Sequence, residues 1–265
     1  MLSAVEREEL FQARLLLERP NLAIRLTNLI GTPIERGFEL LPASWSEVVT
    51  NATRGALQKA LHVAVGSLDD QTLRRPANLA HKLAAAASGA GGGALGLLAL
   101  PIELPISTAV MLRSIADIAR SEGESIRSVE VQLACLEVFA LGGRSRSDDG
   151  AETGYFAVRL ALARAVSEAA EYITERGLVQ EGAPAIVRLI AQISSRFGVE
   201  VSEKAAAQAM PLIGAAGGAL VNILFIDHFQ DVARGHFIIR RLERAHGAES
   251  VREAYGALIP EVVSR

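Results

Sequence analysis

Cysteine and aromatic residues are scarce in this chain, and each scarcity excludes a class of protein. The single cysteine, Cys135, excludes an intrachain disulfide framework and a zinc site built from cysteines. Aromatic residues make up 5% of the 265 residues, although 50% of the residues are hydrophobic. The apolar content therefore consists mainly of small and aliphatic side chains, which favours a protein of closely packed helices.

An excess of one charge and a targeting segment are also missing. The formal net charge is −3, so the chain has no basic field, and nucleic acid is not an expected partner. Charges begin at Glu6, so the first residues lack the apolar segment of a secretory signal. Together with the lone cysteine, this predicts a cytoplasmic protein.

Strand patterns and nucleotide-binding loops are absent as well. No window of about four to eight residues alternates apolar and polar side chains with β-branched enrichment. The string GGGALG, Gly91 to Gly96, satisfies G-x-G-x-x-G, but an alanine-rich stretch precedes it where a dinucleotide site needs a strand. We therefore predict an all-α protein, a multi-helix bundle that carries no cofactor.

Helix start and stop signals organise the chain into one domain. Ser3 and Glu6 form a capping box, and Gly123 ends a later amphipathic helix. In the second half the pattern predicts helices over Ala183–Phe197 and Ser202–Ala245. The expected parts of the domain, residues 1–265, are looser N-terminal helices in residues 1–75, a core in residues 77–245 and a tail helix in residues 249–265.

Two long uncharged runs stand out, Leu83–Ile102 with 20 residues and Ala205–Ile226 with 22. Their length is close to that of a membrane-spanning helix. However, 13 of the 20 residues in the first run are Gly, Ala or Ser, which contribute little transfer energy. We expect two central small-residue helical hairpins; peripheral or reversible membrane insertion remains an alternative.

Glycines four apart place small residues on one helix face. The predicted packing residues are Gly89, Gly92, Gly93, Gly96, Gly214 and Gly218, and Asn222 is predicted to be a buried amide.

Polar residues inside the apolar blocks are the candidates for chemistry. Glu103, between Pro101 and Pro105, is either a desolvated acid or base, or, as we favour, an anion at a helix N-terminus. Asp227, His228, Asp231 and His236 form the densest metal-like set, but no metal motif completes it. We therefore predict no metal there and a polar flank on an amphipathic helix.

A basic amphipathic stretch, RGHFIIRRLERAHG, lies near the C-terminus. Such a helix either lies on an anionic membrane surface or packs on the core with a charged outer face, and the second interpretation is favoured. The candidate membrane-surface residues are Arg234, Arg240, Arg241 and Arg244.

Three stretches carry a family likeness: SGAGGGALGLLALPIELPISTAVMLRSIADIARSEGE, CLEVFALGG and MPLIGAAGGALVNILFIDHFQDVARGHFIIRRLE. From about Leu79 to Glu243 the chain resembles the EcsC family of bacterial proteins. The resemblance implies a mainly helical bacterial protein that is cytoplasmic or membrane-associated. The family is named for a protein encoded beside the two components of an ABC exporter, and it offers no agreed catalytic residues to transfer.

These observations favour a non-enzymatic accessory protein at or near the bacterial inner membrane. Its expected partners are a membrane surface, a membrane protein such as an ABC transporter, or an apolar or lipid ligand. The alternative is a hydrolase with a carboxylate and histidine site, with or without metal, around Glu103, Asp227, His228 and Asp231. The residues alone do not decide whether the protein is an enzyme.

Overall fold

The part of the chain that the structure describes contains ten helices and no strands, which confirms the all-α prediction. The computed structural model describes residues 2–18, 22–67, 100–142, 154–177, 182–210 and 214–258. The helices are α1 (Ala4–Leu17), α2 (Leu22–Ile30), α3 (Glu35–Glu39), α4 (Trp45–Ser67), α6 (Leu100–Ser121), α7 (Val129–Leu141), α8 (Gly154–Arg176), α9 (Pro184–Ala209), α10 (Gly214–His246) and α11 (Ala248–Ala257).

Local signals set several helix ends. Ser3 caps α1: its Oγ accepts a hydrogen bond from the Glu6 amide, and the Glu6 carboxylate accepts one from the Ser3 amide, so the predicted capping box is confirmed. Gly31 and Gly123 follow the ends of α2 and α6 with φ of 70° and 80°. Glycine adopts this left-handed conformation at no steric cost, so the chain can turn sharply there.

One predicted helix boundary is wrong. The sequence suggested a break between Phe197 and Ser202, yet α9 continues through Gly198, and the chain leaves the helix at Met210. Met210 is extended, with φ −70° and ψ 126°. The physical reason is that Pro211 disfavours the helical conformation in the residue before it, whereas an interior glycine costs only about 1 kcal/mol.

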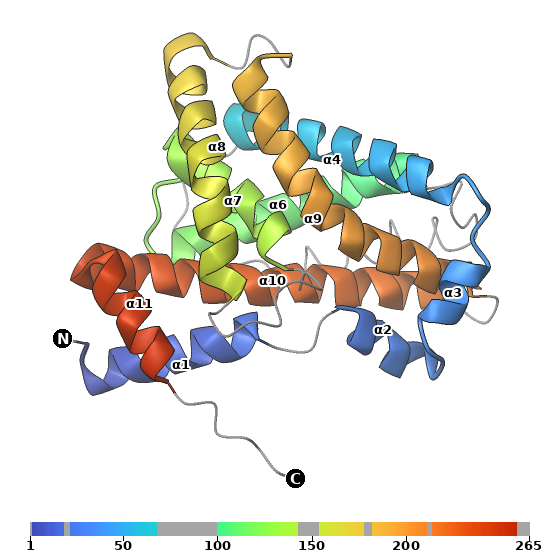
Figure 1. The fold of residues 1–265 in the computed structure, drawn as a ribbon, viewed down its shortest axis with the longest axis horizontal. Coiled ribbons are helices and arrows are strands. Elements are labelled where there is room, and N and C mark those ends of the chain that lie inside the picture. Colours follow the sequence, from blue (N-terminus) through green and yellow to red (C-terminus); the bar gives the residue numbers. More distant parts are fainter. Residues whose placement is uncertain are drawn as a thin grey trace.

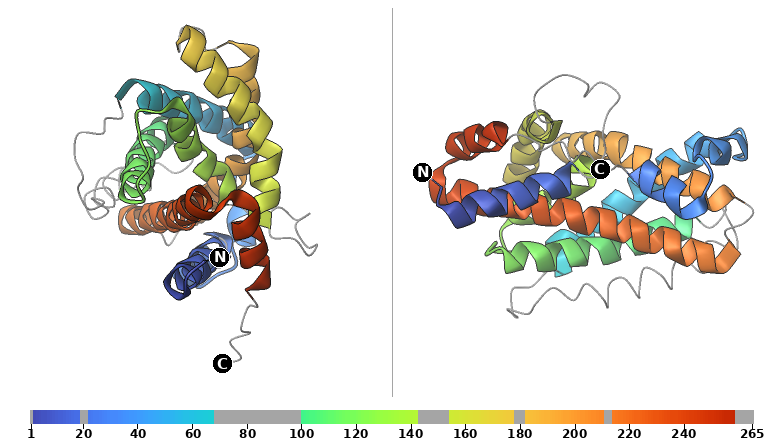
Figure 2. Two further views of the ribbon diagram at one scale, coloured as in Figure 1. Left: turned by 90° about the vertical axis from the view of Figure 1, so that its left-hand side faces the viewer. Right: turned by 90° about the horizontal axis from the view of Figure 1, so that it is seen from below.

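The long helix α10 forms the axis of the bundle (Figure 1). Helices α1 and α2 pack along one side of it, and α6, α7 and α9 pack along the other (Figures 1 and 2). Helix α4 covers α6 and α9, α8 packs on α7 and α9, and α11 returns from the end of α10 to contact α1. Every described helix except α3 contributes buried apolar side chains to one hydrophobic core, and α3 packs on α9.

The few aromatic residues are concentrated where α7, α9 and α10 meet. Phe139 of α7 lies 4.9 Å from Phe197 of α9 between ring centroids, and 5.2 Å from Phe229 of α10. Phe225, one turn before Phe229, completes the group at 6.0 Å from Phe197. Their tilted and edge-to-face contacts add to the burial of large rings and fix these three helices against one another.

Close helix approach through small residues is visible at Gly235 of α10. A Cβ atom added there would lie 2.7 Å from Leu17 Cγ and 2.9 Å from the Ala13 carbonyl oxygen of α1. The absent side chain therefore lets α1 lie directly on α10. Of the packing residues predicted from sequence, Gly214 begins α10 and Gly218 is buried in it; Gly89, Gly92, Gly93 and Gly96 lie outside the described residues, so the hairpins stay a prediction.

Two glycine substitutions test this packing. Gly235→Ala is expected to lower the free energy of unfolding by about 1–3 kcal/mol, because the new methyl group collides with α1 backbone. Gly198→Ala, also in a helix interior but with nothing within 4 Å of the added atom, should raise it by about 0.5–1 kcal/mol. Urea unfolding of both variants measures the difference, and equal effects would contradict the close contact.

Candidate functional site

A buried ion pair joins α6 to α9. Lys204 Nζ lies 2.6 Å from Glu103 Oε1, and the two side chains are 0% and 5% exposed. Asn222 of α10 donates to the same carboxylate oxygen at 2.9 Å, and Gln208 Nε2 lies 3.5 Å from the other oxygen. We call these four residues the Glu103 cluster. It links three helices through one carboxylate.

The surroundings of the Glu103 cluster suit a structural brace. Burial lowers the pKa of Lys204, whereas the adjacent Glu103 carboxylate opposes that change by stabilising the charged amine. Lys204 Nζ also lies 4.9 Å from the centroid of the Phe225 ring, a cation–π contact. None of the four residues lines either hollow described below.

The polar residues of α10 point to separate partners. His228 donates through Nε2 to the Gly142 carbonyl oxygen at 2.8 Å, and burial lowers its pKa to about 4. His236 Nδ1 lies 2.9 Å from the Tyr155 hydroxyl oxygen. Asp231 pairs with Arg234 at 3.1 Å. The two histidines therefore hold α10 against its neighbours, and Asp231 does so through Arg25 of α2 at 3.7 Å.

The candidates of the hydrolase alternative do not share one site. Glu103 meets α10 at Asn222, and His228 is six residues further along, a rise of about 9 Å. Within the described residues, no group of three His, Cys, Asp or Glu side chains is placed to hold a metal ion. Asp227 and Asp231 belong to the same stretch of α10, so they too lie away from Glu103.

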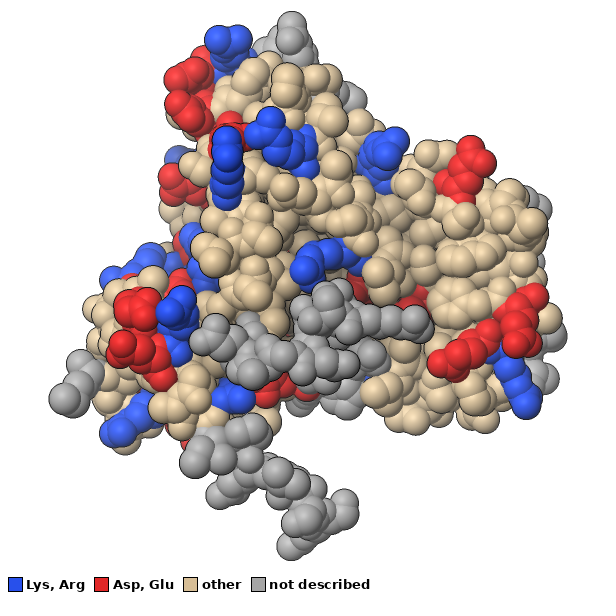
Figure 3. All heavy atoms as spheres, viewed as in Figure 1, with Lys and Arg blue, Asp and Glu red and all other residues tan. Residues whose placement is uncertain are grey.

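A groove of about 1280 Å³ lies among the described residues. Helix α8 forms one wall, and α7, α10 and α11 form the rest, with Arg14 of α1 at one edge. Phe156, Leu160, Ala163 and Val166 make the α8 wall largely apolar, whereas seven glutamates and four arginines line the groove in all. On the face shown in Figure 3, charged side chains of both signs gather at the end where α8, α11 and α1 lie.

Glu137 of α7 is the exceptional side chain of this groove. It is 6% exposed, and burial raises its pKa to about 7, although Arg159 and Arg240 act in the opposite direction. No hydrogen bond or ion pair reaches its carboxylate from any residue that the structure describes. Both arginines are engaged elsewhere: Arg159 binds the Glu243 carboxylate with two nitrogens at 2.8 and 3.0 Å, and Arg240 binds Glu124 at 2.8 Å.

The sequence analysis missed Glu137. The available signal was its setting: within VQLACLEVFAL, residues 131–141, it is the only charged residue, and every residue of that stretch is buried. A helix that is apolar on all faces belongs inside a protein, so its one charge requires an explanation. The same burial raises the pKa of the Cys135 thiol to about 12, which leaves this cysteine unreactive.

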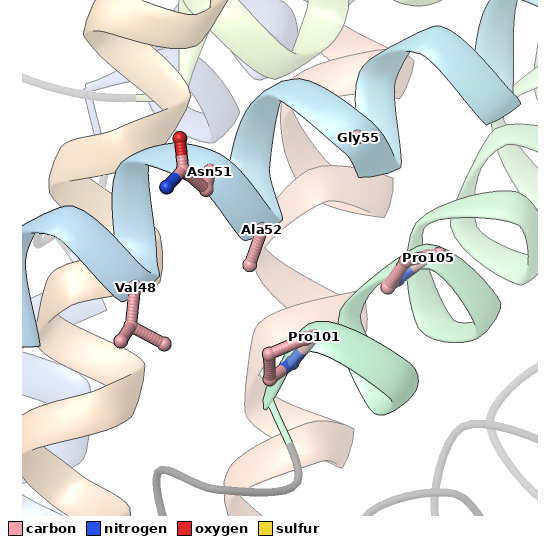
Figure 4. Close-up of a pocket in the computed structure, with 6 residues that line it drawn as sticks. All are labelled: Val48, Asn51, Ala52, Gly55, Pro101 and Pro105. Atoms are coloured by element: carbon pink, nitrogen blue, oxygen red, sulfur yellow. The ribbon is translucent and has the colours of Figure 1, made fainter.

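A smaller hollow of about 330 Å³ lies between α4 and α6 (Figure 4). Val48, Ala52 and Gly55 of α4 line it opposite the rings of Pro101 and Pro105. Gly55 leaves space there, because a Cβ added to it would have no atom within 4 Å. Among the described residues, no ionisable side chain lines this hollow.

A model of the EcsC protein family matches residues 7–242. The chain belongs to this family. The match begins within α1, well before Leu79, so it includes the N-terminal helices that pack on α10 and α6. Helix α11, which forms one wall of the groove, follows the matched residues. Neither the curated proteins nor the solved structures contain a chain that matches this one.

The arginines proposed for a membrane surface all have carboxylate partners. The pairs are Arg234 with Asp231, Arg240 and Arg244 with Glu124, and Arg241 with Glu9 and Glu122. These contacts tie α10 to α1 and to the turn between α6 and α7, so the arginines have a structural role; contact with lipid stays a prediction. None of the described helices is both long enough and apolar enough to cross a bilayer.

Replacing one member of the buried ion pair should be costly. Lys204→Met is expected to lower the free energy of unfolding by about 3–5 kcal/mol, because it leaves the Glu103 carboxylate buried without its cation. The double variant Glu103→Met/Lys204→Met should recover most of this loss, since neither charge is then buried. Urea unfolding of the two variants measures the difference. A double variant no more stable than Lys204→Met would contradict the claim that Lys204 stabilises the buried Glu103 carboxylate.

Proposed function

We propose that the protein is a non-enzymatic accessory protein that binds an amphipathic ligand in the groove between α8 and α11. The observation that carries this proposal is the groove itself, in which apolar side chains of α8 lie among charged side chains of α8, α10 and α11. Small-molecule sites are typically concave, about 300–1000 Å³ in volume, and mainly apolar with a few placed polar groups. A groove of about 1280 Å³ accommodates an extended ligand with one polar end.

Binding explains the polar groups of the groove better than catalysis does. Arg159 and Glu243 form a two-bond ion pair across α8 and α10, and Arg240 is held by Glu124. Such paired charges shape a wall and exclude unsuitable ligands. The one thiol, Cys135, is fully buried in α7 and does not line the groove. The proposal therefore assigns these charges to recognition.

The proposed place of action is at or near the bacterial inner membrane, with a membrane protein such as an ABC transporter as the partner. Support comes from the family resemblance, from the uncharged run Leu83–Ile102 and from the arginine-rich end of α10. Arg234, Arg241 and Arg244 remain between 35% and 43% exposed while paired, so they can also face an anionic surface.

Blocking the groove tests the binding proposal with Nile red, a neutral apolar dye that brightens in apolar surroundings. Saturable dye binding is expected for the wild-type protein. Ala163→Trp should weaken it by about tenfold or more, because the indole fills the groove from an exposed position on α8. Ala161→Trp, an equally exposed change on α8 that does not line the groove, is the matched control and should bind as wild type does. Equal binding by both variants would reject the groove as the site.

Flotation with vesicles tests the membrane part separately. At low salt the full chain should float with phosphatidylglycerol vesicles, and salt should release it, because screening weakens attraction between exposed charges. Arg234→Gln/Arg241→Gln should float less. Arg164→Gln/Arg188→Gln, which removes the same charge from α8 and α9, should float as wild type does. A wild-type protein that stays in the soluble fraction would reject the membrane part alone.

A further inference from the structure

We infer that the groove selects a positively charged amphiphile, an aliphatic chain ending in an amine, and that the Glu137 carboxylate binds the amine. This inference rests on the proposed function of the groove and adds the chemical class of its ligand. It follows from three independent features: a buried carboxylate without a partner, the balance of charge around the groove, and an exposed apolar wall beside it.

The first feature is the contrast between Glu137 and the other buried carboxylates near ion pairs. Glu103 has Lys204 at 2.6 Å, and Glu124 has Arg240 at 2.8 Å. Glu137 is buried to a similar degree, yet among the described residues nothing donates to it. When it is ionised, a largely buried carboxylate without a protein donor has only the water of the groove to stabilise it. Because Glu137 lines the groove, a ligand can supply the missing cation.

The second feature is charge. Among the described residues, seven glutamates line the groove against four arginines, so with Glu137 ionised this part of the lining is acidic. The charged groups that face Glu137 are Arg159 of α8, and Arg240 and Glu243 of α10. The Glu243 carboxylate neutralises Arg159, and Glu124 engages Arg240. An anionic head group would therefore have to displace existing ion pairs, whereas a cationic one meets a free carboxylate.

The third feature is the α8 wall. Leu160 is 77% exposed at the groove, and Phe156 and Val166 beside it are half-buried. An aliphatic chain lying along this wall would remove apolar surface from water, which contributes roughly 25 cal/mol per Å². The same ligand would then satisfy the carboxylate with its amine and cover the leucine with its chain.

Binding of an amine should depend on pH in a defined direction. Burial places the pKa of Glu137 at about 7, and an alkylamine stays protonated far above that pH. Ionised Glu137 binds the ammonium group, so affinity rises as pH increases through about 7, and binding near neutral pH releases a proton. Glu200 of α9 also has a raised pKa, about 8, but it is 2% exposed and lines neither hollow.

The test compares dodecylamine, dodecanol and dodecanoate by calorimetry and by displacement of Nile red, with the alcohol below its solubility limit and the two ionic compounds below their critical micelle concentrations. The wild-type protein should prefer dodecylamine over dodecanol by about tenfold or more. Glu137→Gln should abolish that preference and its pH dependence while keeping dodecanol binding. Glu47→Gln is the control, because it removes an exposed glutamate of α4 that does not line the groove, and it should keep the preference.

The outcomes separate this inference from the proposed function. Equal affinity of the wild-type protein for dodecylamine and dodecanol would overturn the role of Glu137 and leave the groove as a binding site. Tighter binding of dodecanoate than of dodecylamine would also overturn the role of Glu137, because the arginines of the groove would then bind an anion. If neither Nile red nor any of the three compounds binds, both proposals fail. If Glu137→Gln does not fold, the wild-type protein provides the test. Calorimetry of dodecylamine binding in buffers of different ionisation enthalpy measures the protons released, and binding without proton release would overturn the inference.

Discussion

The buried pair of Lys204 and Glu103 is the constraint on which the packing of α6, α9 and α10 depends. A charge removed from water is tolerated only next to a well-placed partner, so these helices must meet at one relative position. Asn222 adds a third attachment to the same carboxylate, and Phe225, one turn further along α10, contacts both the amine and Phe197. The polar brace and the aromatic core therefore specify the same arrangement. Helix α4 lies across α6 and α9 and shields this junction.

Much of the fold follows from local patterns. The capping box at Ser3 and the positive φ of Gly31 and Gly123 are set by residues within one turn, so the sequence predicts these helix ends. The predicted break near Phe197 is wrong, because α9 continues through Gly198 and ends at Ala209, shortly before Pro211. Glycine merely lowers helix stability, whereas proline removes a hydrogen bond and restricts its neighbour. The sequence therefore predicts that this region is helical. Placing the boundary between α9 and α10 also requires that proline be treated as a stronger helix breaker than glycine.

The sites were less predictable, because their residues come from distant parts of the chain. Glu103 was found from its apolar, proline-flanked setting, but its partner Lys204 is 101 residues away, and no pattern joins them. His228 and Asp231 looked like a pair from their spacing, yet His228 binds the Gly142 carbonyl and Asp231 binds arginines. Spacing along a helix shows which residues share a face; the neighbours of that face, which come from other helices, decide their partners.

Glu103 and Glu137 show how the same residue type takes two roles under the same physical rule. Both carboxylates are buried, and each must be stabilised by a donor or remain at a cost. The fold supplies donors to Glu103 from two helices, and that carboxylate lies away from both hollows. It supplies Glu137 with no such donor from the described residues, and Glu137 lines the groove. The proposed amine would be that donor, so the same requirement lets one carboxylate join helices and would let the other bind a ligand.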